Sequence, residues 1–328
     1  MKRIHVMAAV IERGDAVFIA RRPDHLHQGG KWEFPGGKLE AGESPLQGLT
    51  RELHEEIGIE VQSAQPLIRI CHDYPDKSVL LDVWRVTAFA GDPHGKEGQR
   101  VQWVPRHILH EFEFPAANVP IVAAVQLPTF YMISPEVESI ADFVQGLRKT
   151  VERGFRLIQI RVRQLTREDG SVLLAEMRAL KREYPVSFLC NSALDLIAGD
   201  APQSSDWSGA DVFDGLHLTS RDLARLSRRP DNLRWLAASC HSLEEIRLAE
   251  KLGVDFVTLS PVKPTLSHPD AQPLGMTQFA EWVEQARVPV FGLGGLDEQD
   301  LSELTAVGAQ GVAGIRGLWQ FRSTQCSE

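Results

Sequence analysis

The stretch GGKLEAGESPLQGLTRELHEEIGI, residues 36–59, holds the strongest structural signal in the chain. Ser44 is a good helix N-cap, Pro45 suits the first helical position, and Gly58 is a natural stop. Gln47 lies three residues after Ser44 and completes a capping box. Four apolar residues recur at helical spacing between these limits and predict one buried stripe: Leu46, Leu49, Leu53 and Ile57.

The same helix concentrates negative charge on a neighbouring arc. Glu52, Glu55 and Glu56 lie close together, and Glu43 precedes them. Like charges at these spacings repel, and Arg51, placed to brace Glu55, is the only Lys or Arg of the last two turns. A solvated helix face normally mixes in more basic residues. Because Mg²⁺ takes oxygen ligands and bridges to substrate phosphates, the pattern predicts a metal site for a polyphosphate.

The bulk composition indicates a globular protein of two domains. The chain has 328 residues, 43% of them hydrophobic and 24% charged. A formal net charge of -9 argues against a broad nucleic-acid or membrane surface. The four cysteines form no C-x-x-C pair, so we expect reduced thiols and a cytoplasmic protein. No apolar stretch is long enough to cross a bilayer.

Hydrophobic periodicity changes character near residue 128. Before it, residues 6–11 and 16–20 predict a hairpin, and further strands are expected at 67–71, 79–89 and 101–104. After it, short apolar runs alternate with helix-like stretches and predict a (β/α)8 barrel. We therefore expect domains at 1–128 and 129–328. The barrel strands are expected at residues 130–133, 157–160, 186–190, 215–218, 235–239, 256–260, 288–293 and 311–315.

The glutamate helix also carries a family resemblance. Gly37, Glu43 and the run RELHEEIGI, residues 51–59, match the Nudix box at every defined position. Enzymes of this family hydrolyse a nucleoside diphosphate linked to another group, using a divalent metal. The resemblance implies an α/β/α sandwich and Mg²⁺ as cofactor, with Mn²⁺ as a substitute. It implies metal binding by the Gly37 carbonyl and by three carboxylates, those of Glu52, Glu55 and Glu56.

The flanking sequence resembles the MutT branch of this family. The resembling pieces are EFPGGK at 33–38, GKEGQ at 95–99 and FPAANVPI at 114–121, together with the spacing of Arg21, Arg22 and His27. MutT proteins are 8-oxo-dGTP diphosphatases, which release pyrophosphate and keep oxidised guanine out of DNA. The resemblance therefore implies a nucleoside triphosphate substrate and a role in nucleotide-pool sanitation and DNA repair.

The MutT resemblance also assigns substrate contacts. Asn118 would read the purine edge, because its amide offers both a donor and an acceptor. Main-chain groups around Phe34 and near Arg22 would sense the oxidised position. Arg22, or its neighbour Arg21, would hold phosphate with its fixed fork of donors. His27 is either a ligand contact or a structural histidine.

Two carboxylates are candidates for the general base that removes a proton from water. Glu52 is the first choice and Glu97, in the GKEGQ loop, is the second. The resemblance implies that Glu97 also joins the helix glutamates at the metal. The expected catalytic residues are Arg51, Glu52, Glu55 and Glu97.

Residues 131–319 resemble the thiamin-phosphate synthase family, which includes a relative that isomerises the thiazole precursor. The resembling pieces are QIRVR at 159–163, GLHLTSRDL at 215–223, ASCHSLEEI at 238–246, FVTLSPVKPT at 256–265, PVFGLGG at 289–295 and GVAGI at 311–315. Loops after the last strands of such barrels often bind phosphate. The expected ligand site comprises Arg161, Asn191, Asp222, His241, Thr265, Gly294, Gly295 and Gly314.

Three positions depart from the synthase pattern. Ser192 stands where the synthase has an aspartate that binds Mg²⁺, and Arg163 and His268 stand where it has lysines. Asp222 matches the second metal carboxylate. Losing one carboxylate and two lysines weakens a site for pyrophosphate and Mg²⁺. His241 matches a position that the isomerising relatives use for proton transfer.

Several functions remain open for the fused chain. The leading one is a Mg²⁺-dependent 8-oxo-dGTP pyrophosphohydrolase attached to a divergent synthase-like barrel. In the alternative, the Nudix domain hydrolyses a pyrophosphate of thiamin metabolism. The barrel is then a synthase, an isomerase-like enzyme or a non-catalytic sensor of a thiamin-type phosphate. We expect neither direct nucleic-acid binding nor membrane insertion.

Overall fold

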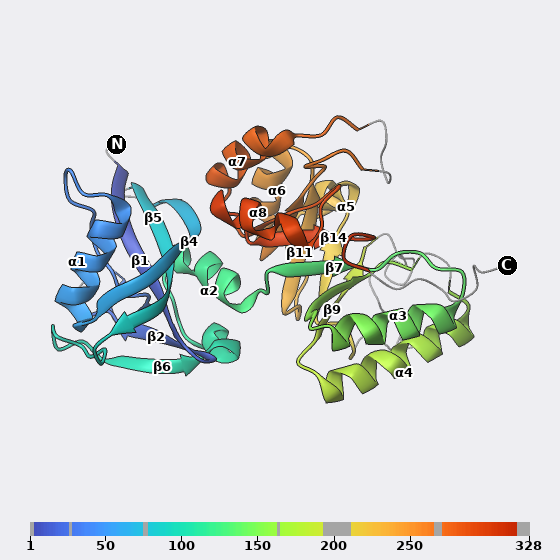
Figure 1. Ribbon diagram of the computed structural model, residues 1–328, viewed down its shortest axis with the longest axis horizontal. Coiled ribbons are helices and arrows are strands. Elements are labelled where there is room, and N and C mark those ends of the chain that lie inside the picture. Colours follow the sequence, from blue (N-terminus) through green and yellow to red (C-terminus); the bar gives the residue numbers. More distant parts are fainter. Residues whose placement is uncertain are drawn as a thin grey trace. The chain divides into compact units, whose positions relative to one another are not determined.

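Figure 1 shows the computed structural model, which describes residues 3–25, 28–74, 78–162, 165–192, 211–265 and 271–319. The chain divides into two compact units. The first holds Met1–Leu127 with the short segments Val283–Pro289 and Thr305–Gln310, and the second holds the remainder. The main chain leaves the first unit after Leu127. That the two sequence domains fold independently on either side of residue 128 stays a prediction.

The first unit is built on a mixed β-sheet. Its strand order is β3-β2-β1-β5-β4, with β6 pairing to β2. The expected hairpin is confirmed as the antiparallel pair β1 and β2, and β1 also runs parallel to β5. The strands are β1 (Arg3–Arg13), β2 (Ala16–Arg21), β3 (Trp32–Glu33), β4 (Glu60–Asp73), β5 (Ser78–Ala90) and β6 (Val101–Pro105).

One helix covers each face of this sheet. Successive residues of a strand point to opposite faces, so β1 supplies side chains to two cores. Met7, Ala9 and Ile11 pack with helix α1 (Pro45–Ile57). Ala8 and Val10 pack with helix α2 (Val119–Gln126), which follows the 3₁₀ turns η1 (Arg106–Glu111) and η2 (Ala116–Asn118). The predicted α/β/α sandwich is therefore confirmed.

Helix α1 begins and ends where the sequence predicts. The Ser44 hydroxyl accepts a hydrogen bond from the Gln47 N–H, the Gln47 side chain accepts one from the Ser44 N–H, and Gly58 has a left-handed φ of 74°. One residue of the expected apolar stripe does not belong to it. Leu46, in the first turn, is 44% exposed, whereas Leu49, Leu53 and Ile57 are fully buried.

The second unit is a closed barrel of parallel strands in the order β10-β11-β12-β13-β14-β7-β8-β9. Each predicted barrel strand is confirmed within a residue or two at its ends. The strands are β7 (Phe130–Ile133), β8 (Leu157–Ile160), β9 (Ser187–Asn191), β10 (Gly215–Leu218), β11 (Trp235–Cys240), β12 (Phe256–Leu259), β13 (Val290–Gly292) and β14 (Gly311–Gly314).

Within the described ranges, a helical element follows each of the strands β7, β8, β10, β11, β12 and β13, in the order typical of a (β/α)8 barrel. Because all the strands run in one direction, their carboxyl ends meet at one end of the barrel. The described helical elements are α3 (Ile140–Glu152), α4 (Arg167–Glu183), α5 (Ser220–Arg225), α6 (Leu243–Leu252), α7 (Gly275–Gln285), η3 (Glu298–Asp300) and α8 (Leu301–Ala306).

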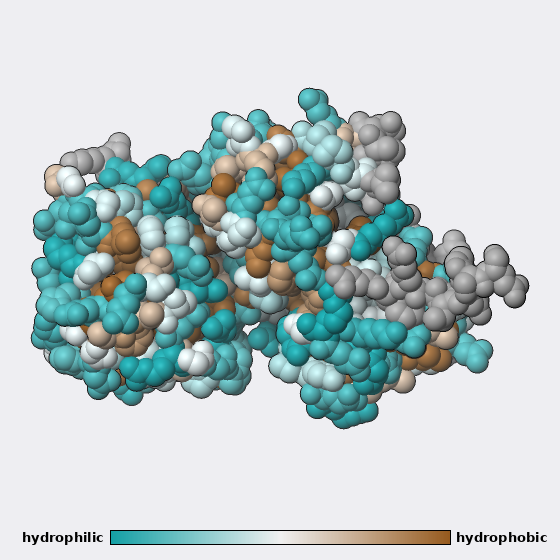
Figure 2. Space-filling model, viewed as in Figure 1, coloured by the Kyte–Doolittle hydropathy of each residue, from teal (hydrophilic) through white to brown (hydrophobic). Residues whose placement is uncertain are grey.

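The surface is mainly polar on the face that Figure 2 shows, with hydrophobic residues exposed between hydrophilic ones. Within the described ranges, every helix is too short or too polar to span a bilayer.

Candidate functional site

A cavity of about 290 Å³ opens in the first unit. It brings together four of the residues singled out in the sequence: Arg22, Phe34, Gly37 and Asn118. Arg22 directly follows β2, Phe34 and Gly37 lie in the loop after β3, and Asn118 lies in the turn before α2, so their convergence depends on the tertiary fold. His27, also expected here, lies outside the described residues.

Asn118, the residue that we expect to contact the purine edge, lies at the start of α2. Asn118 is the N-cap of that helix, yet its side chain makes no capping hydrogen bond. An N-cap asparagine normally satisfies a free helical N–H, so this amide is not used in the ordinary structural way. Phe34 lies nearby in the cavity wall and stacks on Phe114, with ring centroids 5.3 Å apart. A flat base therefore has an apolar wall beside an amide.

Only one of the two candidate phosphate-binding arginines lines this cavity. The Arg21 guanidinium donates to the Gly30 carbonyl at 2.9 Å and to the Asp24 carboxylate at 3.1 Å. Arg22 lines the cavity and donates to the Glu33 carboxylate. The Arg22 N–H, which we expected near the oxidised base, already donates to the carbonyl of Lys31 at 2.9 Å.

Glu33 was not anticipated as a site residue. Its side chain lines the cavity and pairs with Arg22, and burial raises the pKa of its carboxyl although Arg22 opposes the shift. The signal in the sequence was a lone carboxylate directly before the Phe-Pro-Gly-Gly run. Lys38 and Tyr74 also line the cavity without having been predicted.

Arg51 organises the acidic face of α1. It makes two hydrogen bonds to Glu43, of 2.8 and 3.0 Å, and one of 2.9 Å to Glu52. Its contact with Glu55, the one expected from helical spacing, is longer at 3.3 Å. The hydrogen bonds from Arg51 lower the pKa of Glu43 to about 2, with help from the Glu40 N–H. Glu43 thus anchors Arg51, while Glu55 is more exposed.

Glu56 is the buried member of the cluster. Its carboxylate accepts a hydrogen bond from the Gly36 N–H at 2.8 Å. Burial raises the pKa of Glu56 to about 7 against this hydrogen bond, and the charges of Glu33 and Glu97 add to the rise. The negative charges of Glu33 and Glu97 therefore disfavour a charge on Glu56. A bound cation would relieve that repulsion.

The donors around α1 fit a hard divalent cation. A Cβ atom on Gly37 would lie 2.1 Å from a carboxylate oxygen of Glu52, so only glycine lets the main chain approach this carboxylate. The Gly37 carbonyl accepts one hydrogen bond, from Met7, and keeps a second lone pair. Across the described ranges, no three acidic, His or Cys side chains are already gathered around one point. Arg51 holds Glu52, and Gly36 holds Glu56.

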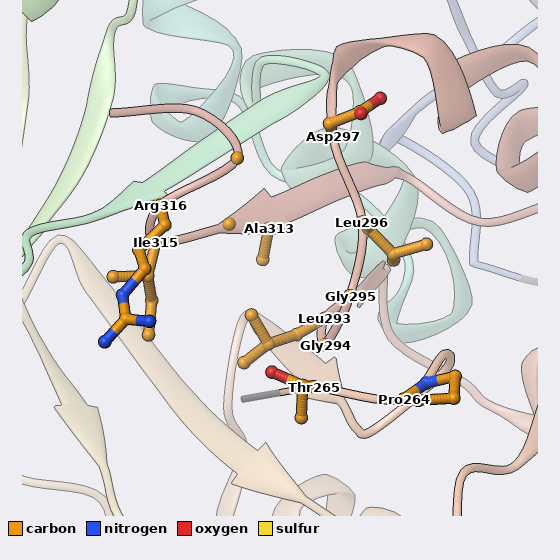
Figure 3. A pocket seen from close by; sticks show the side chains of 12 residues that line it. Pro264, Thr265, Leu293, Gly294, Gly295, Leu296, Asp297, Ala313, Ile315 and Arg316 are labelled. Atoms are coloured by element: carbon orange, nitrogen blue, oxygen red, sulfur yellow. The ribbon is translucent and has the colours of Figure 1, made fainter. Parts of the chain in front are cut away.

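A second cavity, also of about 290 Å³, opens at the carboxyl ends of the last barrel strands. Figure 3 shows Thr265 from the loop after β12 facing the Gly294-Gly295 turn, with Ile315 and Arg316 on the other side. Gly314 lines it as well. Arg316 was not predicted, although a basic residue directly after the last strand was its signal.

The Gly294-Gly295 turn requires glycine at both positions. Their φ angles are 98° and 66°, which side chains rarely adopt. A Cβ atom on Gly295 would lie 2.4 Å from the carbonyl oxygen of Pro264. The main chain of this turn therefore packs closely against the loop after β12.

Four expected barrel residues lie at the same end of the barrel but do not line this cavity. Asn191 ends β9, and Asp222 lies in the first turn of α5. The Nδ1 atom of His241 lies 2.9 Å from the Ser260 carbonyl oxygen, which leaves Nε2 for other partners. The Arg161 N–H donates to Ser134. Burial, with the Arg161 charge second, lowers the pKa of His217 to about 3.

The residues at Asp222 do not fit a divalent metal. Ser192, where the synthase pattern has aspartate, donates its hydroxyl to the Asp222 carboxylate. Thr219 donates to the same oxygen at 2.7 Å. Where the synthase pattern has two carboxylates, Asp222 and Ser192 supply one carboxylate, which accepts from two hydroxyl groups. The negative charge of this pair is therefore half of that in the synthase pattern.

Two family profiles match this chain, one before and one after residue 128. The NUDIX domain profile matches residues 6–124, and the profile described as thiamine monophosphate synthase matches residues 130–318.

Individual relatives agree with both profiles. The 8-oxo-dGTP diphosphatase of Escherichia coli K12 is 38% identical over 127 residues, which are 38% of this chain and 98% of the relative. The CTP pyrophosphohydrolase of the same bacterium is 36% identical over 124 residues, 38% of this chain and 92% of the relative. The thiamine-phosphate synthase of Desulfitobacterium hafniense Y51 is 30% identical over 183 residues, 54% of this chain and 82% of the relative.

Proposed function

Since the chain belongs to the Nudix hydrolases through residues 6–124 and to the thiamine monophosphate synthase family through residues 130–318, we propose that its first domain hydrolyses 8-oxo-dGTP. The products are 8-oxo-dGMP and pyrophosphate, because water adds across the bridge between the α- and β-phosphates. One observation carries the proposal. A single cavity is lined by Asn118, whose amide makes no capping hydrogen bond, by Phe34 and by Gly37, which lies against the Glu52 carboxylate of α1.

The cavity supports a division of labour along the nucleotide. The Asn118 amide pairs with the base edge, and Phe34 supplies apolar contact with the ring. Arg22, held by Glu33, supplies a planar cation for phosphate oxygens. This order places the triphosphate toward Gly36 and Gly37, at the mouth of the acidic cluster.

The acidic cluster would hold the divalent ion. Its ligands would be the Gly37 carbonyl and the carboxylates of Glu52, Glu55, Glu56 and Glu97. When bound, a divalent cation supplies positive charge against the triphosphate and lowers the pKa of water. We propose Mg²⁺, with Mn²⁺ as a substitute, because both accept oxygen ligands of this kind.

The carboxylates also supply the proton acceptor. Glu52 is the proposed general base and Glu97 the second candidate. Arg51 holds the Glu52 carboxylate at 2.9 Å and is itself fixed by Glu43, so the base stays oriented. Arg51 is thus a positioning residue.

The second domain is proposed to bind a phosphate-bearing ligand at the cavity of Thr265, Gly294, Gly295 and Gly314. Backbone donors and the Arg316 guanidinium suit such a group. His241, with Nε2 left over, keeps an isomerase-like proton transfer open as a second candidate activity.

Steady-state hydrolysis by the full chain with Mg²⁺ tests the first-domain proposal. The substrates to compare are 8-oxo-dGTP, dGTP, CTP and thiamin pyrophosphate, with identification of the products. We expect a strong preference for 8-oxo-dGTP, giving monophosphate and pyrophosphate. Preference for CTP would move the function toward the other Nudix relative, and preference for thiamin pyrophosphate would tie both domains to thiamin metabolism.

A further inference from the structure

The carboxylate of Asp222 lies at the carboxyl end of β10, where the synthase pattern expects half of a metal site. Instead it takes part in the N-terminal cap of α5. Asp222 is the third residue of that helix, its N–H donates to the Thr219 hydroxyl at 3.2 Å, and one of its carboxylate oxygens accepts from Thr219 at 2.7 Å. The carboxylate therefore closes the helix start.

Ser192 completes this arrangement from the neighbouring strand. Its hydroxyl donates to the same Asp222 oxygen and accepts from the Thr219 N–H at 2.9 Å. One serine thus connects the end of β9 to the start of α5 through hydrogen bonds alone. A cation is not needed to hold the two loops together.

The charge at this position is also too low for a hard divalent ion. Affinity for such ions is set by the number of charged oxygen ligands. Serine supplies a neutral hydroxyl, so among the residues that the structure describes a single carboxylate, that of Asp222, remains at this position. His217, a buried base on β10, is engaged on both ring nitrogens, by Tyr131 at 3.0 Å and Ser239 at 2.8 Å.

We propose that the barrel has no divalent-metal site at Asp222 and takes its phosphate-bearing ligand without a divalent ion. Pyrophosphate groups in proteins usually arrive with Mg²⁺, whereas one phosphate can be held by a guanidinium and main-chain donors. The ligand class that fits is therefore a phosphomonoester, with Arg316 as its cation. The choice of ligand class rests on the proposed phosphate-binding role; the statement about the metal does not.

Hydrogen exchange of the full chain, with Mg²⁺ or with EDTA, tests the proposal peptide by peptide. In the wild type, peptides covering residues 215–225 should exchange at the same rate in both conditions. Peptides covering the Nudix helix should be protected by Mg²⁺ and serve as an internal control. Protection of residues 215–225 by Mg²⁺ would overturn the proposal. Absence of protection at the Nudix helix would count against the hydrolase metal site instead, so the two failures are distinguishable.

Three variants sharpen the result. Ser192→Asp restores a second carboxylate, and its 215–225 peptides should become protected by Mg²⁺; adding Asp222→Asn should abolish that protection. Ser192→Ala is the matched control, which loses the hydrogen bond without gaining charge and should stay indifferent to Mg²⁺. Indifference of a folded Ser192→Asp variant would contradict the role given to Ser192. If that variant exchanges faster than the wild type in both conditions because it is misfolded, the wild-type comparison decides alone.

Discussion

Glu52 bears on the proposed metal site more directly than any other residue, since it touches both Gly37 and Arg51. Glu52→Gln keeps shape and helix propensity but removes a charge. We expect kcat to fall by more than about 100-fold, beyond the usual cost of losing a residue that merely supports a metal ligand. The change in thermal unfolding should be small. Glu60→Gln, an exposed carboxylate outside the cluster, is the matched control; equal losses in both variants would refute the assignment.

A substitution at Asn118 tests which base the enzyme recognises rather than how the phosphate bond is hydrolysed. Asn118→Ala removes both halves of the proposed pairing with the base edge. A bidentate amide contact is worth about 1–3 kcal/mol of discrimination. We therefore expect kcat/KM for 8-oxo-dGTP to fall by roughly 5- to 150-fold, while the ratio between 8-oxo-dGTP and dGTP moves toward one. An unchanged ratio would remove Asn118 from base recognition.

His217 makes the stability of the barrel depend on pH. Burial lowers the pKa of His217 from 6.5 to about 3 in the folded protein. Between these values the unfolded chain binds a proton that the folded chain does not. Stability therefore falls as the pH drops below about 6.5, by up to about 1.4 kcal/mol per pH unit from this group.

His217→Gln isolates this contribution, because glutamine can still accept from Tyr131 but does not titrate. Exchange of peptides from β10 and β11 should rise less between pH 7 and pH 5 in the variant than in the wild type, after correction for intrinsic rates. A variant as sensitive as the wild type would show that other groups dominate this pH range.

At the scale of elements, helix α1 depends on its first turn. Ser44→Ala removes the hydroxyl that accepts from the Gln47 N–H and should cost about 1 kcal/mol, while the main-chain N–H of residue 44 can still donate to the Gln47 side chain. We expect faster hydrogen exchange in the first turn and a lower unfolding temperature for the first unit. Ser139→Ala is a matched control, since Ser139 caps α3 in the barrel. Its effect should appear in barrel peptides and leave α1 unchanged.

Helix α2 is an element that the sequence pattern does not predict. The segment FPAANVPIVAAVQ reads as a turn-rich stretch because of Pro115 and Pro120. Pro120, however, occupies the first turn of the helix, where a missing N–H costs nothing. Five consecutive residues of α2, from Ile121 to Val125, are buried. The sequence therefore shows no one-sided apolar stripe, which is the usual signal of an amphipathic helix.

For the whole molecule, the proposed division at residue 128 predicts a separable hydrolase. A fragment of residues 1–128 should hydrolyse 8-oxo-dGTP with kcat/KM comparable to that of the full chain, because every proposed site residue lies within it. A fragment ending at residue 118 should fail to fold, since it lacks α2, whose Ile121 and Val125 are fully buried. An inactive 1–128 fragment would show that the hydrolase depends on the rest of the chain.

The sequence alone determined the elements whose signals are local. Caps, apolar stripes and short strand runs are set by neighbours in the chain, so α1, the first hairpin and the barrel strands could be placed from Ser44, Gly58 and the apolar runs. The helix glutamates of the proposed metal site could be selected for the same reason: Glu52, Glu55 and Glu56 share one helix at helical spacing.

Only the tertiary structure decided which distant side chains meet. Arg22 rather than Arg21 lines the cavity, and it pairs with Glu33, which was not expected there. The hydrogen bonds of Arg51 to Glu43 and Glu52 are shorter than its contact with Glu55. Asp222 matches a metal carboxylate of the synthase family, but in this structure it takes part in the N-terminal cap of α5. Hydrogen bonds and burial between residues far apart in sequence follow from packing, which local spacing does not encode.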